Sequence, residues 1–293
     1  MYEAISANRT KSALVMVVFI LIIVALGYTF GEIADIGYAA TAVAFVLAIA
    51  SVFTSYYYSD RIVLAISQAR PATRAEFRHL YNTVEGLSIA AGLPLPRLYV
   101  IDDSAPNAFA TGRDPEHAAI AVTTGLLDKL DRYELEGVIG HEMAHIADYD
   151  IRFMTMVAVL VGTISLLSDW MLRFFRIGGG RRSRRRGGSG LFVVVGLLLA
   201  MVAPMVAFLL QMAMSRTREY LADAQGGMLT RYPDGLADAL EKLAADTEPL
   251  EVANKATAHL YIINPLTEHK GVVNNLFSTH PPIQDRVRRL REM

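Results

Sequence analysis

The stretch GVIGHEMAHIADYD, residues 137–150, decides how this chain folds. Its histidines, His141 and His145, are four residues apart, so on a helix both imidazole rings project from one face, one turn from each other. Two imidazoles so placed can bind a single metal ion. Glu142 is poorly placed to bind the same ion but near enough to act as a base toward water there. The alternative is a half-buried helix whose histidines are satisfied by neighbouring groups.

The surrounding sequence predicts that this stretch is helical and lies next to a small sheet. Asp131 and Glu134 form a capping pair at the start of a helix that reaches about Asp150. Its apolar stripe consists of Leu135, Val138, Ile139 and Ile146. Helical spacing also predicts a helix over 71–92, which ends at Gly92. Between the two helices, the strand-like segments are 97–101, 107–111 and 117–125.

The composition restricts the kind of metal site and the kind of partner. The 293 residues include no cysteine, so a metal ion must be held by histidines and carboxylates. The formal net charge of −1 gives no reason to expect nucleic acid as a partner. The chain is 53% hydrophobic with a mean hydropathy of +0.32, which is too apolar for a typical soluble protein.

The apolar excess begins with two uncharged runs, residues 12–31 and 36–59. About twenty such residues cross the hydrocarbon core of a bilayer, so the two runs predict an amino-terminal membrane hairpin. Arg9 and Lys11 precede the first run and several arginines follow the second, whereas the turn between them carries only acidic charges. The positive-inside rule therefore places both ends of the hairpin, and the part of the chain that follows, in the cytoplasm.

A second apolar pair, residues 153–168 and 191–215, surrounds the Gly/Arg/Ser-rich segment 173–190, which we expect to be disordered. If both runs span the membrane, this basic segment falls outside the cell, against the positive-inside rule. Either the segment is translocated regardless, or the pair is buried or re-entrant on the cytoplasmic side. We favour four spans.

A candidate third ligand lies in SRTREYLADAQGG, residues 215–227. On a helix, Glu219 and Asp223 fall one turn apart on the same side. Glu219 could complete a His, His, Glu site that leaves one position for water, while Asp223 could accept the second ring hydrogen of a histidine ligand. The alternative is a solvated charged face, in which Arg216 and Arg218 pair with these acids.

The chain resembles the HtpX-type membrane zinc metalloproteases, bacterial heat-shock proteases related to the eukaryotic CAAX prenyl proteases. The resemblance depends on the amino-terminal hairpin and on four motifs in the family's order. These motifs are PNAFATG at 106–112, HEMAHIADYD at 141–150, SRTREYLADA at 215–224 and LFSTHPPIQDR at 276–286. Together they cover almost the whole chain.

The resemblance implies a role for each matching residue. It implies zinc ligands at His141, His145 and Glu219, a general base at Glu142, supporting acids at Asp150 and Asp223, and an arginine that braces these acids at Arg216. The stretch Asn107, Ala108 and Phe109 matches a strand beside the catalytic cleft, where extended substrate would bind. His280 matches a family histidine near the active site, where it could steady the oxyanion with Arg286 close by. The alternative for His280 is the start of a helix, since Pro281 and Pro282 suit a first turn.

The expected protein is therefore mainly α-helical, with a zincin-like (gluzincin) metalloprotease domain, a small β-sheet and two hydrophobic helical hairpins. The first hairpin is residues 1–60, and the metalloprotease domain is divided into 61–150 and 215–293 by the second hairpin, 151–214. Since both histidines and Glu219 must reach one ion, both ends of this insert return to the same face. The zinc would then lie near the membrane surface.

The expected activity is zinc-dependent endopeptidase cleavage of damaged or misassembled membrane proteins, in the cell membrane with the site facing the cytoplasm. Its partners would be protein or peptide substrates and the lipid bilayer, and not nucleic acid. Two alternatives remain: a processing peptidase with one narrow substrate, and a non-catalytic membrane adaptor with a degenerate metal site. A transporter is disfavoured, because the first two apolar runs contain no charged residue.

Overall fold

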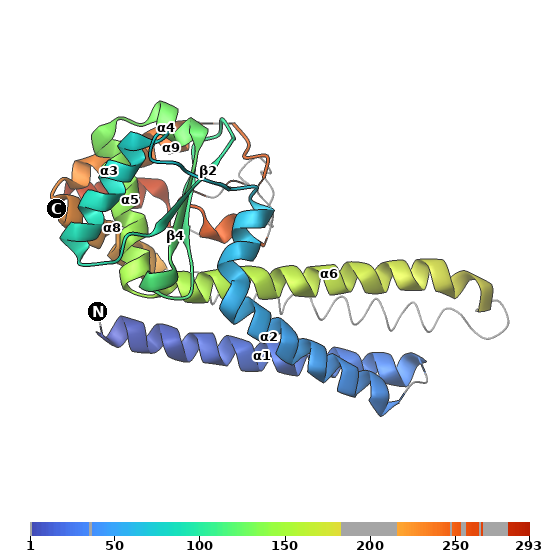
Figure 1. Ribbon diagram of the computed structural model, residues 1–293. Coiled ribbons are helices and arrows are strands. Elements are labelled where there is room, and N and C mark those ends of the chain that lie inside the picture. The colour runs from blue at the N-terminus through green and yellow to red at the C-terminus, as the bar shows by residue number, and fades with distance from the viewer. Residues whose placement is uncertain are drawn as a thin grey trace.

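The structure is a computed structural model that describes residues 2–34, 37–182, 216–246, 248–252, 256–263, 265 and 281–293. The described chain combines long helices that project from one side with a globular part built of shorter helices and a small sheet (Figure 1). The helices are α1 (Tyr2–Ala34), α2 (Tyr38–Ile66), α3 (Arg78–Ala91), α4 (Thr124–Lys129), α5 (Arg132–Ala147), α6 (Asp150–Arg182), α8 (Arg216–Thr230), α9 (Pro233–Ala245) and α10 (Ile283–Arg291). The strands are β1 (Arg70–Pro71), β2 (Arg97–Ile101), β3 (Ala108–Thr111) and β4 (Ala119–Thr123), and short 3₁₀ turns lie at Pro115–His117 and Ala258–Leu260.

Among the described residues, three helical segments are long and apolar enough to cross a membrane: Thr10–Thr29, Tyr38–Ile66 and Asp150–Leu167. The first two confirm the predicted amino-terminal hairpin, and the third contains most of the predicted run 153–168. The other predicted run, 191–215, lies outside the described residues. A fourth span there stays a prediction.

The long helices pack on one another and expose the rest of their apolar surface. Phe153, Val157 and Leu160 of α6 share a buried cluster with Val15 and Phe19 of α1. On α2, by contrast, large apolar side chains are exposed, among them Phe45 (51%), Val46 (65%) and Leu47 (55%). Such a contiguous exposed apolar surface suits lipid rather than water. The chain is thus a membrane protein.

Helix α6 corrects one prediction. We expected residues 173–190 to be disordered, but α6 continues to Arg182, so the prediction is wrong for 173–182. A glycine in a helix costs roughly 1 kcal/mol relative to alanine. Because α6 has already formed before this segment, each further residue adds a hydrogen bond without a new nucleation cost, and this gain offsets the cost of the glycines. Residues 183–190 lie outside the described part of the chain.

The sheet has four strands in the order β1-β2-β4-β3, with β2 and β4 parallel and the other pairs antiparallel. Strand β3 is therefore an edge strand. Alternate residues of β4 point to opposite faces, as the pleat requires. Ile120 and Val122 join the core formed with α3, α5 and α9, whereas Ala119 and Ala121 join a second cluster with residues of α2 and α6. The sheet thus separates the globular helices from the membrane helices.

The ends of two predicted helices can be compared directly with the structure. Helix α5 starts as predicted, because the Asp131 side chain accepts from the backbone of Glu134 and the Glu134 side chain accepts from the backbone of Asp131. Helix α3 ends as predicted at Gly92, whose φ of 67° is left-handed. It begins later than predicted, at Arg78, because Pro71 is paired with Tyr99 in the sheet instead.

Candidate active site

Helix α5 carries the candidate metal ligands through the middle of the globular part. We expected one apolar stripe, but every residue from Gly137 to Ile146 is buried. Helix α8 approaches α5 so closely that a Cβ on Gly226 would lie 2.8 Å from the backbone nitrogen of His141. Only a glycine fits at this crossing, and the close approach brings the first turn of α8 over the two histidines.

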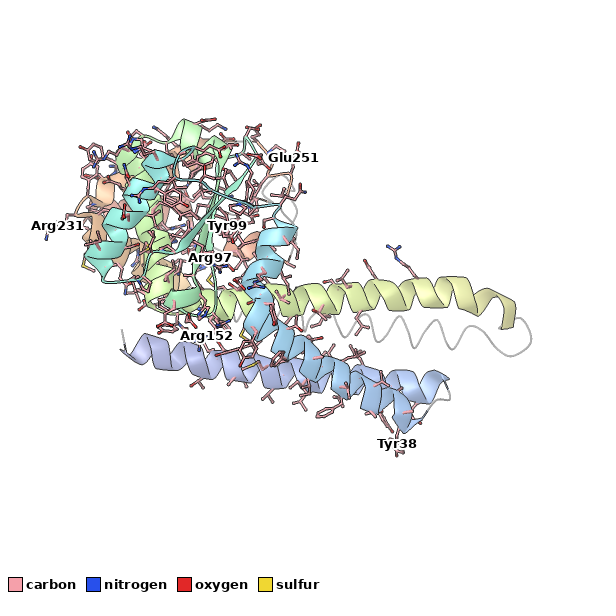
Figure 2. All side chains as sticks on the ribbon, in the orientation of Figure 1. Tyr38, Arg97, Tyr99, Arg152, Arg231 and Glu251 are labelled. Carbon is pink, nitrogen blue, oxygen red and sulfur yellow. The ribbon has the colours of Figure 1, made fainter. Side chains whose placement is uncertain are left out.

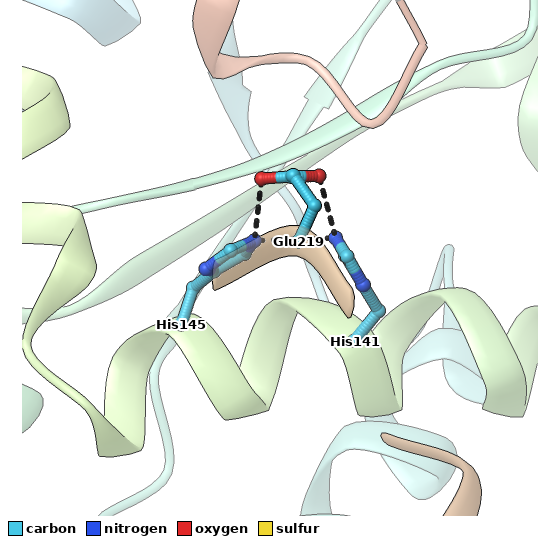
Figure 3. Close-up of side chains that lie close together, drawn as sticks. All are labelled: His141, His145 and Glu219. Carbon is cyan, nitrogen blue, oxygen red and sulfur yellow. Dashed lines mark hydrogen bonds and ion pairs between the residues drawn. The ribbon is translucent and has the colours of Figure 1, made fainter. Parts of the chain in front are cut away.

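Figure 3 shows His141 and His145 on α5 with Glu219 of α8 above both rings. The two Nε2 atoms are 3.2 Å apart, and the Glu219 carboxylate oxygens lie 3.8 Å from Nε2 of His141 and 3.6 Å from Nε2 of His145. All three side chains are buried, and their ligand atoms are grouped closely enough to hold a metal ion. The structure therefore brings together the three residues that the sequence proposed as ligands.

The donor set fits a zinc ion. Two ligand atoms about 2.05 Å from a tetrahedral zinc are separated by about 3.3 Å, close to the distance between the two Nε2 atoms. Each Nδ1 is already engaged, His141 with Asp223 at 2.9 Å and His145 with Asp150 at 3.1 Å. A ring whose Nδ1–H donates to a carboxylate keeps its Nε2 lone pair free for a metal.

The turn between α5 and α6 places Asp150 beside His145. Helix α5 ends at Ala147, and Tyr149 has a φ of 61°, an uncommon value for a residue with a large side chain. The turn redirects the chain within two residues, so that the side chain of Asp150, the first residue of α6, contacts His145 of the preceding helix. The guanidinium of Arg152 lies over the Tyr149 ring, 5.3 Å from the centroid of that ring.

Two arginines hold the supporting acids. The fully buried Arg286 donates from Nε and Nη2 to Asp223, at 2.8 and 2.6 Å, and from Nη1 to the Ile262 carbonyl at 3.1 Å. Arg218 donates to Asp150 at 3.0 Å. Arg216, the arginine expected to brace these acids, is exposed at the start of α8. Among the described residues, the bracing contacts belong to Arg218 and Arg286 instead.

The buried charges shift the pKa values of the site in opposite directions. Burial opposes the charge of Asp223, but the Arg286 guanidinium holds its pKa at about 2. Burial also opposes a positive charge on His145, yet the Asp150 hydrogen bond and the Glu219 carboxylate raise its pKa to about 9. For His141, burial prevails over the Asp223 hydrogen bond and lowers the pKa.

Glu142 lies beside the ligands without joining them. It is 2% exposed, and burial raises the pKa of its carboxyl group to about 7. The backbone N–H of Ala110, on β3, donates a hydrogen bond to this carboxylate. A carboxyl group with a pKa near neutrality can both accept and return a proton under physiological conditions.

The outer edge of β3 faces this carboxylate and is partly covered. The backbone N–H of Ile262 donates to the Ala108 carbonyl at 3.0 Å, and the Asn107 amide donates to the Ile263 carbonyl at 3.0 Å. The Phe109 side chain lies on the face of β3 that packs toward α2 and α6, where its ring is edge-on to that of Tyr261 with the two ring centroids 5.0 Å apart. Of the three residues proposed to bind substrate, Asn107 and Ala108 thus lie at the edge beside Glu142, and Phe109 packs away from it.

The remaining proposed residue, His280, lies outside the described residues. Sequence reasoning missed the contacts of Arg286 with Asp223, because LFSTHPPIQDR suggested only that this arginine follows the histidine on the last helix. It also missed the contact of Arg218 with Asp150 and that of the Ala110 backbone with Glu142. Arg218 stands beside a recognised carboxylate in SRTREYLADA, which is a usable signal. A backbone N–H donor such as that of Ala110 leaves no signal in the sequence, because every residue other than proline has one.

The fold and the site define a membrane-embedded metallopeptidase. The model of peptidase family M48 matches residues 74–293, and the chain belongs to this family. It is a metalloprotease.

The relatives cover the whole chain. A Protease HtpX homolog of Dictyoglomus thermophilum is 49% identical over 100% of this chain and 94% of its own length. One from Tropheryma whipplei is 45% identical over 100% of this chain and 98% of its own length. A crystal structure of S. mikatae Ste24p matches 99% of this chain and 67% of its own, with 18% identity and a TM-score of 0.49.

Proposed function

We propose that the chain is a zinc endopeptidase that cleaves damaged or misassembled membrane proteins, with His141, His145 and Glu219 as the zinc ligands and Glu142 as the general base. The observation that supports this most directly is the convergence of two Nε2 atoms 3.2 Å apart beneath the Glu219 carboxylate, with both Nδ1 atoms held by acids. In an ordinary helix nothing requires two Nε2 atoms to meet beneath one buried carboxylate while acids hold both Nδ1 atoms.

His141, His145 and Glu219 would hold the zinc, which when bound would supply Lewis-acid polarisation of the scissile carbonyl and of the attacking water. Glu142 takes a proton from that water as its oxygen adds to the carbonyl carbon. As the C–N bond breaks, Glu142 passes the proton to the departing amine. The Ala110 N–H fixes the carboxylate between the proposed ligands and β3, where it can accept the proton and return it.

The substrate is proposed to bind as an extended strand along β3, by main-chain hydrogen bonds that tolerate many sequences. The Ala108 carbonyl is taken by Ile262 in this structure. A peptide that pairs at this point therefore has to displace the segment around Ile262. The N–H and C=O groups of β3 that face β4 are used by the sheet and take no part.

The site is proposed to lie close to the cytoplasmic membrane surface. Tyr38 stands at the end of α2 farthest from the globular part, and Arg152 lies where the globular part meets the long helices (Figure 2). The Arg152 guanidinium is 5.7 Å from the Tyr56 ring centroid, and Arg113 is 5.6 Å from that of Tyr57. Tyrosines and arginines at such positions are typical of a membrane interface. Since Asp150 is two residues before Arg152, substrates that emerge from the bilayer would reach the site directly.

The test measures zinc content and cleavage of an unfolded test protein by detergent-purified wild type and Glu142→Gln. We expect about one zinc in each and cleavage by wild type alone. Cleavage by both would overturn the role of Glu142. If both bind zinc and neither cleaves, the broad specificity is wrong, and a processing peptidase with a narrow substrate becomes the better description. Absence of zinc from wild type would remove the proposed ligand set.

A further inference from the structure

We propose that Asn8, near the start of the first membrane helix, is a positioning residue for the metal site: it orients Asp150 and, through Asp150, the ring of His145. The inference rests on the proposed role of His145 as a ligand. It assigns to the membrane hairpin a part in shaping the site, beyond anchoring the chain.

The contacts of Asn8 cross 142 residues of sequence and are buried at both ends. The Asn8 Nδ2 donates to Asp150 Oδ1 at 2.6 Å and to the Asp148 carbonyl at 3.0 Å. Asn8 is 3% exposed, and Asp150 is also 3% exposed. One amide group therefore holds both the last residue before the turn at Tyr149 and the first residue after it.

The two oxygens of Asp150 have separate partners. Oδ2 accepts from His145 Nδ1 at 3.1 Å, while Oδ1 accepts from Asn8 and from Arg218 at 3.0 Å. With Oδ1 fixed by two donors, the plane of the carboxylate is fixed and Oδ2 is aimed at the ring. The contacts of a carboxylate that supports a histidine ligand set the orientation of that ring.

Packing alone gives no reason for an amide at this position. Farther along α1, Val15, Phe19 and Ile22 already join α1 to α6 in an apolar cluster. Burying an amide costs free energy unless it is hydrogen-bonded, and both hydrogen bonds of the Asn8 Nδ2 go to the turn beside the ligands. The apolar residues thus hold α1 against α6, and the Asn8 amide in addition orients the turn that carries Asp150.

The experiment compares full-length wild type, Asn8→Leu and Ser12→Ala in detergent micelles. Leucine has the same number of side-chain heavy atoms as asparagine and the same branch at Cγ, so it keeps the shape of the side chain and removes its hydrogen-bonding groups. Ser12 is the matched control, since it is equally buried at 3%, one turn along α1, and within the described part of the chain its hydroxyl donates to the Asn8 carbonyl and not to the turn beside the proposed ligands. Three quantities are measured: Zn²⁺ affinity by chelator competition, the absorption spectrum of the Co²⁺-loaded protein, and thermal unfolding of the metal-free protein.

We expect Asn8→Leu to bind Zn²⁺ about tenfold more weakly and to shift the Co²⁺ bands, because contacts behind a ligand typically change metal affinity by 10- to 100-fold. Ser12→Ala should match wild type in both. Wild-type affinity and spectrum in Asn8→Leu would overturn the proposal. A lower unfolding temperature with an unchanged Co²⁺ spectrum would also overturn it, by showing a packing role only. If wild type binds neither metal, the ligand set itself fails, and this inference fails with it.

Discussion

Arg286 and Asp223 form a buried ion pair in which the guanidinium donates two hydrogen bonds to one carboxylate, at 2.8 and 2.6 Å. Arg286 comes from α10 and Asp223 from α8, and the carboxylate also lies 2.9 Å from Nδ1 of His141. The pair therefore joins the last described helix to the candidate metal site. Arg286 is 0% exposed and Asp223 is 3% exposed, so water cannot solvate either charge if its partner is removed.

Replacing Arg286 with glutamine should strongly destabilise the protein. Breaking a buried pair by removing one partner typically costs about 3–5 kcal/mol, because the other charge stays buried without compensation. For a protein of this size the unfolding temperature of the metal-free protein should fall by about 10 °C. Thermal unfolding in detergent micelles, followed by circular dichroism, measures this shift.

The control for that variant is Arg291→Gln on the same helix. Arg291 is 37% exposed and pairs with Asp234 and Asp238, which are 45% and 41% exposed, so solvent screens both contacts and their loss should cost about 1 kcal/mol. Equal shifts for the two variants would show that the buried pair contributes no more than a surface pair.

Raising the pH from 7 to 9 should strengthen metal binding. In the metal-free protein the pKa of His145 is raised to about 9, so the ring carries a proton at pH 7. Since the metal binds the neutral ring, this proton must leave, and the affinity should rise about tenfold for each pH unit until the ring is neutral in the free protein. Chelator competition at pH 7, 8 and 9 tests this. An affinity that does not change over this interval would contradict the raised pKa.

Replacing Gly226 with alanine should weaken metal binding by at least about tenfold, since the ligand geometry of a zinc site is narrow. The added Cβ would lie 2.8 Å from the His141 nitrogen and 3.1 Å from its Cα, so α8 must move away from α5 and take Glu219 with it. Gly86→Ala is the matched control, because Gly86 lies on α3 with nothing within 4 Å of an added Cβ. It should leave metal affinity unchanged and stabilise the helix by about 0.5–1 kcal/mol. Similar losses of affinity in both variants would rule out the close approach as the cause.

A peptide that pairs along the edge of β3 should expose the Ile262 amide. This N–H is hydrogen-bonded to Ala108 and Ile262 is 1% exposed, so its hydrogen exchange is slow in the free protein. In Glu142→Gln, which should hold a peptide without cleaving it, added peptide is expected to speed exchange at Ile262 and to leave Leu240 of α9 unchanged. Unchanged exchange at Ile262 with peptide bound would place the substrate elsewhere.

The parts of the fold that depend on short-range patterns were predictable. The capping pair at Asp131, the stop at Gly92 and the amino-terminal hairpin all follow from residues within one or two turns of one another. So does the shared face of His141 and His145, because four residues make about one helical turn. Glu219 could be joined to them only by taking two separate motifs as parts of one His, His, Glu site, which the family resemblance also implies.

The parts that depend on distant residues were not predictable. Asn8 lies in a segment whose dominant signal is hydrophobicity, and nothing nearby indicates a contact with Asp150. The exposure of Arg216 and the burial of Arg286 differ although both are arginines near helix starts, because tertiary packing decides which of them meets a carboxylate. The burial of α5 on all sides has the same origin, since its polar residues serve the site instead of marking a solvent face.

The order of the proposed ligands along the chain also sets an order in time. Seventy-three residues separate His145 from Glu219, and Arg286 comes later still. A ribosome that has released α5 and α6 has therefore made a peptide with two histidines and no carboxylate to close the site over them. Until Glu219 has been made, the nascent chain lacks one of the proposed ligands, so the proposed centre is completed only after the hydrophobic segments before it have left the ribosome.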